Sequence, residues 1–250
     1  MKDELVPISK TLRHHIWMLV FRSVLLLIAI CLYFFYREAL DYTAVFQQGL
    51  SGAFLWVVWL TLVINMMYRL IPNRRIATGA RKHFACTYSA ALPSGKVTEE
   101  KQISPGQLHK GALLSGLGWF VISAAVIVAL FLLDMLSPAI VLIFALVYAV
   151  FDLIFVLFFC PLQAFFMHNR CCVSCRIYNW DYFMMCAPLI VFPHVYSVSL
   201  FLLSLTVLLR WEIAVRKTPH YFVKETNASL TCETCDERLC RLHYRIKRDC

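Results

Sequence analysis

Four apolar segments of about 20 residues each constrain this chain more than any other feature. A helix of about 20 residues crosses the ~30 Å hydrocarbon core of a bilayer. The sequence is 60% hydrophobic and only 16% charged, which is atypical of a soluble domain. We therefore predict an all-α, polytopic helical membrane protein. Its four clear transmembrane helices are expected at Ile16–Tyr36, Ser51–Ile71, Gly111–Leu133 and Pro138–Phe159.

The distribution of Lys and Arg predicts how these helices are oriented, because both residues concentrate in cytoplasmic loops. The segment 72–110 carries seven of them, whereas the turn at 134–137 carries none. We expect this basic loop and the N-terminus to be cytoplasmic, in a multi-pass protein of the cytoplasmic membrane. Orientation also accounts for the net charge of +9. Since no aromatic or glycine-rich binding module accompanies the basic residues, we predict the lipid bilayer and no nucleic acid as partner.

The uncharged segment 183–209 leaves the topology of the last part of the chain open. As a helix it would be about 40 Å long, which suits one tilted pass but not two full ones. A single fifth span would leave the tail outside, yet the tail is the most basic part of the chain and favours the cytoplasm. A hairpin broken at Pro188 and Pro193 reconciles the two arguments, with a re-entrant or interfacial first limb. We favour the hairpin and keep the single span as the alternative.

Two C-x2-C pairs flank this segment and predict a metal site. Each short loop can present two sulfurs to one ion, and two such loops build a tetrahedral four-thiolate site. The hairpin would bring both pairs to the cytoplasmic side. Zinc is the metal we expect first, and an iron ion or iron–sulfur cluster is the alternative. The four paired ligands are Cys172, Cys175, Cys232 and Cys235, with Cys171 and Cys240 as additional candidates.

The spacing of the two pairs departs from that of a soluble zinc ribbon. Fifty-six residues separate Cys175 from Cys232, against about 15 to 20 in the usual ribbon. The excess matches an excursion of the chain through the membrane. In the alternative topology, an outside tail would favour disulfides, and Asn227 in "NAS" would be a glycosylation acceptor in a eukaryotic host.

The same stretches carry a resemblance to a known group of proteins. "CCVSCRIYNWDYFMM", "LLRWE" and "NASLTCETCDERLC" resemble the CCxxCRIxNWD and CxxCxxxLC signature of uncharacterised bacterial multi-spanning membrane proteins. The likeness covers about the last third of the chain. It implies that both cysteine clusters belong to one structural unit and that the host membrane is a bacterial cytoplasmic membrane. It implies no activity.

Polar residues inside the apolar segments are the other candidates for function, because a charge in lipid is costly without a partner or cavity. Asp152 would carry a proton, pair with Arg22, or be protonated and bonded to a neighbouring helix, and we favour a structural role. Arg22 lies close enough to the cytoplasmic edge to snorkel. Asn65 is expected to bridge helices and His194 to cap the chain break.

These observations predict two units and a non-catalytic function. Residues 1–167 form a four-helix membrane region with the basic cytoplasmic loop 72–110. Residues 168–250 form a unit in which metal staples the Cys-rich tail, also cytoplasmic, to the C-x2-C loop. The metal would have a structural or regulatory role, with the basic tail available to a protein partner. The alternatives are a thiol-redox or iron–sulfur electron-transfer protein and a small transporter using Asp152. No catalytic motif occurs, and we lean against an enzyme.

Overall fold

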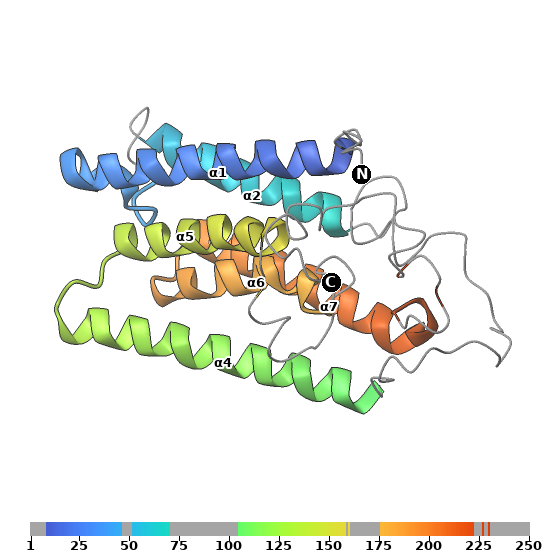
Figure 1. Ribbon diagram of the computed structural model, residues 1–250. Coiled ribbons are helices and arrows are strands. Elements are labelled where there is room, and N and C mark those ends of the chain that lie inside the picture. The colour runs from blue at the N-terminus through green and yellow to red at the C-terminus, as the bar shows by residue number, and fades with distance from the viewer. Residues whose placement is uncertain are drawn as a thin grey trace, which may run out of the picture.

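Long apolar helices dominate the computed structural model, which describes residues 9–46, 52–70, 105–158, 160, 176–222, 227 and 230. Apart from the single bridge residue Asn227, this part of the chain contains no β-structure. Five helices are long and apolar enough to cross a membrane. They lie side by side in Figure 1, with α1 and α2 on one face and α4 on the opposite face. Their bounds are α1 (Lys10–Phe35), α2 (Ala53–Leu70), α4 (Pro105–Leu132), α5 (Pro138–Leu157) and α7 (Val195–Lys217).

The four predicted transmembrane helices are confirmed as long apolar helices, with different starting points for two of them. α1 begins before Ile16 because the Ser9 side chain caps it, with Ser9 Oγ accepting a hydrogen bond from the Leu12 N–H at 3.1 Å. α4 begins at Pro105, so the end of the predicted 72–110 loop is helical. Proline is favoured at a first helical position because no intrahelical partner is needed there. Residues 71–104 of that loop lie outside the described part.

A short turn joins α4 to α5. Asp134 has φ 53, the left-handed conformation that ends many helices. Its N–H bonds the Phe131 carbonyl, and the Met135 N–H bonds the Leu130 carbonyl, which together form a Schellman motif. Ser137 Oγ then accepts from the Ile140 N–H at 3.4 Å, and Pro138 opens α5. The chain thus stops one helix and caps the next within a few residues.

The segment between α5 and α7 contains a broken apolar arm, residues 176–191. It consists of the 3-10 helix η4 (Arg176–Asn179), the short helix α6 (Asp181–Cys186) and the 3-10 helix η5 (Ala187–Val191). The α-helix ends at Cys186 and the chain continues as a 3-10 helix through Pro188, whose ring nitrogen has no N–H to donate to an α-helical hydrogen bond. The chain then reverses and α7 begins at Val195. The described residues therefore match the predicted hairpin and not one continuous helix over 183–209.

His194 does cap the chain break, as predicted, but through its backbone. It is the N-cap residue of α7, and its N–H donates to Ser197 Oγ at 2.9 Å. The Ser197 hydroxyl also lies 2.9 Å from the Phe192 carbonyl oxygen. The Ser197 hydroxyl thus joins the first turn of α7 to backbone groups of the reversal.

Hydrogen bonds between distant residues fix the direction of the arm. We call the end of the bundle with the start of α1 and the ends of α2 and α7 the proximal end, and the opposite end the distal end (Figure 1). At the proximal end, Trp180 Nε1 donates to Glu212 Oε1 of α7 at 2.9 Å. At the distal end, Tyr42 OH donates to the Leu189 carbonyl at 3.0 Å. The arm therefore runs from the proximal end to the distal end, and α7 brings the chain back.

The hydrophobic core lies between α1, α2, α5, the arm and α7. α5 is the most buried of the five long helices, and α4 the least. On α5, Ala145 and Ala149 are almost fully buried, and small residues of this kind let membrane helices approach closely. α1 is the helix packed most extensively against α5.

Candidate functional site: a buried charge cluster at the base of the arm

The base of the arm is held by an ion pair between α2 and α6. Arg69, in the last turn of α2, has its Nη1 2.7 Å from the carboxylate of Asp181, the first residue of α6. The same nitrogen donates to the Tyr178 carbonyl at 3.0 Å. The side chains of Arg69 and Asp181 are 15% and 6% exposed, so water screens the pair only weakly. Arg69 thereby ties η4 and α6 to the end of α2.

A second arginine approaches the same region from α1. Arg22 Nη1 donates to the Ala149 carbonyl at 2.8 Å and lies 3.4 Å from Asp152 Oδ2, both on α5. Its Nη2 donates to Tyr182 OH of α6 at 3.0 Å. The residue is 4% exposed. Arg22 therefore links three elements that are far apart in the sequence.

The two arginines meet at aromatic side chains of the arm. The Arg69 guanidinium carbon lies 4.7 Å from the ring centres of both Tyr178 and Tyr182, and that of Arg22 lies 5.8 Å from the Tyr182 ring centre. Burial raises the pKa of the Tyr178 phenol, so this ring stays neutral. A cation over a neutral ring gains an attraction that strengthens when water is excluded. Tyr182 thus receives a hydrogen bond from one arginine and lies against the other.

The formal charges of the cluster balance. Two arginines and two aspartates, one on each of four elements, contribute two positive and two negative charges. Buried charges are tolerated when they are paired and hydrogen-bonded, and losing one partner leaves the other uncompensated. The arrangement is suited to holding four elements in one register, and we call these four residues the charge quartet: Arg22, Arg69, Asp152 and Asp181.

Trp180 closes the base of the arm on the side of α4 and α7. Its Nε1 bonds Glu212, and its ring lies against Gly116 of α4, where an added Cβ would be 2.9 Å from Trp180 Cζ3. Ala112 of α4 joins Ile177 and Met184 in a small apolar cluster beside it. A larger residue at 116 would therefore force the indole or α4 to shift.

Of the predictions for polar residues in the apolar segments, some agree with the structure and others do not. Asp152 pairs with Arg22, one of the three roles considered for it. The prediction that Arg22 snorkels to the edge is wrong, because its side chain points into the bundle, where three oxygens accept from it. The prediction that Asn65 bridges helices is also wrong, since its Nδ2 bonds the Thr61 carbonyl of its own helix at 2.6 Å. Because the Asn65 side-chain amide is hydrogen-bonded within its own helix, it needs no partner on another helix.

The predicted metal ligands lie outside the described residues, so their geometry stays a prediction. They are Cys171, Cys172, Cys175, Cys232, Cys235 and Cys240. Within the described residues, no group of three His, Cys, Asp or Glu side chains is placed to hold a metal ion. The described thiols are those of Cys31, Cys160 and Cys186, and Cys186 is fully buried in α6.

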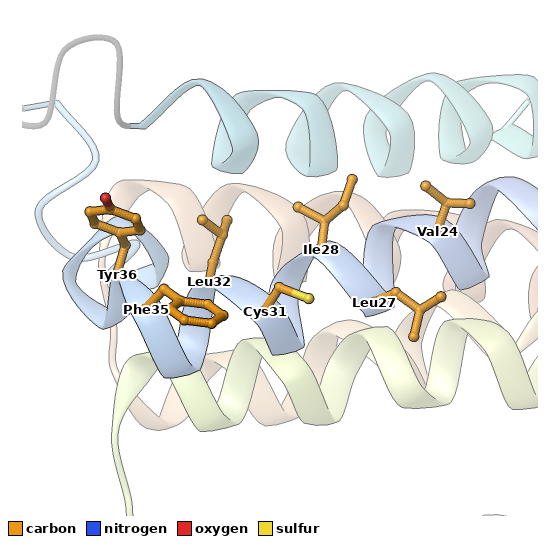
Figure 2. A pocket seen from close by; sticks show the side chains of 7 residues that line it. All are labelled: Val24, Leu27, Ile28, Cys31, Leu32, Phe35 and Tyr36. Carbon is orange, nitrogen blue, oxygen red and sulfur yellow. The ribbon is translucent and has the colours of Figure 1, made fainter.

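A shallow apolar groove lies along the distal half of α1. Figure 2 shows its lining side chains, which come from α1 and from Tyr36 at the C-cap of that helix. It contains no charged group, and in a bilayer such a face is covered by acyl chains. We therefore assign no ligand to it. The lining residues are Val24, Leu27, Ile28, Cys31, Leu32, Phe35 and Tyr36.

Comparison of the chain with protein-family models, curated proteins and solved structures gives no match. The resemblance to the bacterial membrane protein group accordingly stays a prediction. Two members of the charge quartet, Arg69 and Asp181, were missed as site residues from the sequence. Each of them is visible in the sequence as a formal charge at the edge of an apolar segment. However, nothing in the sequence indicates that positions 112 residues apart form a pair.

Proposed function

We propose that this protein is an integral membrane protein whose cytoplasmic cysteine clusters bind one metal ion, which orders the C-terminal tail. The metal has a structural or regulatory role. It staples the tail to the base of the arm, and the ordered basic tail is then presented to a protein partner. No step of this function requires a catalytic residue.

The hydrogen bond between Trp180 and Glu212 carries the proposal. It joins the start of the arm to the last turns of α7 at the proximal end. Cys175 immediately precedes the arm in the sequence, and the tail with Cys232 and Cys235 follows α7. Two clusters whose neighbouring elements lie at the same end of the bundle belong to one side of the membrane. That is the condition for a shared site, and the single-pass alternative would not meet it.

Zinc is the metal that this proposal favours. Four thiolates in two C-x2-C pairs give the closed tetrahedral set typical of structural zinc. Iron uses the same ligands, as a single ion or a cluster, and would turn the site toward electron transfer. Cys171 and Cys240 provide further thiolates beside the paired ligands.

Elemental analysis of purified protein tests the proposal. The wild type is expected to contain about one zinc ion per chain, the stoichiometry of a single four-thiolate site, and both Cys172→Ser/Cys175→Ser and Cys232→Ser/Cys235→Ser are expected to lose it. Cys31→Ser is the matched control, because Cys31 lies on the exposed face of α1. Loss of metal in both double variants, with retention in the control, supports one shared site.

Three other results would contradict the proposal. Absence of metal from the wild type would remove the site. Loss from only one double variant would mean that the clusters do not share an ion. Visible absorbance with stoichiometric iron would replace the structural role with the electron-transfer alternative, because a zinc thiolate site has no visible absorption band.

The proposed orientation places the proximal end in the cytoplasm. Lys10, Arg13, Arg216 and Lys217 are exposed there, and Lys and Arg near helix ends favour the cytoplasmic side. In this orientation both chain termini are cytoplasmic. Reaction with a membrane-impermeant maleimide in inside-out vesicles tests it. With the native cysteines replaced by Ser, the single cysteine of Ser9→Cys should react and that of Glu38→Cys should not.

A further inference from the structure

Exposed basic side chains gather at the proximal end of the bundle. They come from three helices, with Lys10 and Arg13 on α1, Lys110 on α4, and the others on the last turns of α7. The contact between Trp180 and Gly116 places the first half of α4 at this end together with α7. Long Lys and Arg side chains near helix ends extend toward the headgroup layer. We call these residues the basic belt: Lys10, Arg13, Lys110, Arg210, Arg216 and Lys217.

Acidic side chains do not neutralise the belt within the described part of the chain. Asp152 and Asp181 are engaged in the charge quartet, and Glu212 is half-buried and bonded to Trp180. At the distal end the balance is reversed, because Glu38 and Asp134 are exposed there beside Arg37. Among the described residues, the exposed side chains at the two ends of the bundle therefore carry opposite net charge. An unneutralised positive belt attracts anionic groups.

Two exposed aromatic residues lie near the belt. Trp17 is one helical turn beyond Arg13 on α1 and is 68% exposed, and Tyr68 in the last turn of α2 is 57% exposed. Trp and Tyr concentrate at the level of lipid headgroups, where their rings meet acyl chains and their polar atoms meet water. Cations with an aromatic layer beneath them match the chemistry of a phospholipid, with phosphate above and carbon chains below.

We propose that the basic belt binds anionic phospholipid headgroups of the cytoplasmic leaflet. The phosphates lie against the Lys and Arg side chains of α1, α4 and α7, while the acyl chains cover the apolar faces next to Trp17 and Tyr68. The inference depends on the charges of the described residues and does not depend on the metal site. It predicts a preference for phosphatidylglycerol over phosphatidylcholine that increases at low salt, since exposed charges are screened by ions.

Fluorescence quenching by brominated lipids in reconstituted vesicles tests the proposal. Brominated phosphatidylglycerol and brominated phosphatidylcholine quench tryptophans that they approach, and the ratio of their binding constants measures lipid preference. We expect the wild type to prefer phosphatidylglycerol and to lose most of that preference between about 0.05 and 0.5 M salt, as the Debye length falls. In the variant Lys10→Gln/Arg13→Gln/Arg216→Gln/Lys217→Gln, the ratio of the two binding constants should fall at least about fivefold. This is the effect expected from losing one juxtamembrane charge.

Arg37→Gln at the distal end is the matched control and should leave the preference unchanged. If the fourfold variant does not fold, Lys10→Gln/Arg13→Gln and Arg216→Gln/Lys217→Gln are measured separately, with circular dichroism as the check of helix content. Equal binding of the two lipids by the wild type would overturn the proposal. So would an unchanged preference in the belt variants, or an equal loss in Arg37→Gln.

Discussion

Removal of Arg69 should destabilise the protein more than removal of Asp181, although the two residues form one ion pair. Without Arg69, the Asp181 carboxylate loses the cation 2.7 Å away in a site where its side chain is 6% exposed. Without Asp181, the Arg69 guanidinium still has the Tyr178 carbonyl and the rings of Tyr178 and Tyr182. The asymmetry follows because Arg69 keeps more close partners than Asp181, which retains a backbone hydrogen bond at Tyr182 and the more distant charge of Arg22.

The magnitudes follow from these remaining contacts. An uncompensated buried charge costs about 3–5 kcal/mol, which we expect for Arg69→Met. Two cation–π contacts of about 0.5–2 kcal/mol each stay with Arg69, so Asp181→Leu should cost about 1–3 kcal/mol. The double variant removes both charges together. It should cost less than the sum of the single variants by about 2 kcal/mol or more, because neither charge is left alone.

The free energy of unfolding in mixed micelles provides the measurement. Helix content and tryptophan emission are followed as the fraction of denaturing detergent increases, and Trp180 reports directly from the residue next to Asp181. Equal losses in the two single variants would refute the asymmetry. Additive losses in the double variant would refute the ion pair itself, since independent sites add within about 0.5 kcal/mol.

Three further predictions use the same measurement. Asp152→Asn should lower the free energy of unfolding by about 1 kcal/mol, less than Arg69→Met does. The Arg22–Asp152 distance is 3.4 Å, Asp152 is 17% exposed, and Arg22 keeps two other acceptors. A loss as large as that of Arg69→Met would contradict this reasoning. Gly116→Ala should cost about 1–3 kcal/mol because its Cβ would meet the Trp180 ring, whereas Gly118→Ala, with open space around it, should be neutral or stabilising; equal effects would refute the contact. Asp134→Gly should add about 0.5–1 kcal/mol by relieving the left-handed conformation, and Asp134→Val should destabilise, so the reverse order would show that the turn differs.

Much of the architecture was predictable because apolar length in a bilayer leaves few choices. The spans at α1, α2, α4 and α5 follow from runs of about 20 apolar residues, and the break before α7 follows from Pro188 and Pro193. The start of α4 was predicted too late because its first turn is polar and carries no hydrophobic signal. Only Pro105 marked that start, and a proline in a polar segment equally indicates a turn.

The charge quartet was less predictable because its members are paired across long distances. Asp152 and Arg22 were both visible as charges inside apolar segments, and that pairing was one of the options considered. The predicted direction of the Arg22 side chain was wrong. Snorkelling assumes that water offers the best hydrogen-bond partners, whereas α5 and α6 supply three acceptors inside the bundle. Asp181 and Arg69 lie 112 residues apart in the sequence, and only the structure places them together. The cysteine site stays a prediction.

The order in which the quartet is synthesised has a consequence for membrane insertion. The chain makes both arginines, on α1 and α2, before it makes either aspartate, on α5 and α6. During that interval Arg22, within the apolar stretch of α1, and Arg69, at the end of α2, have no carboxylate partner, and for a charge inside the hydrocarbon this state costs several kcal/mol. Asp152 and then Asp181 arrive later and remove this cost in two steps. A chain that stops before the arm therefore lacks the carboxylate that pairs with Arg69.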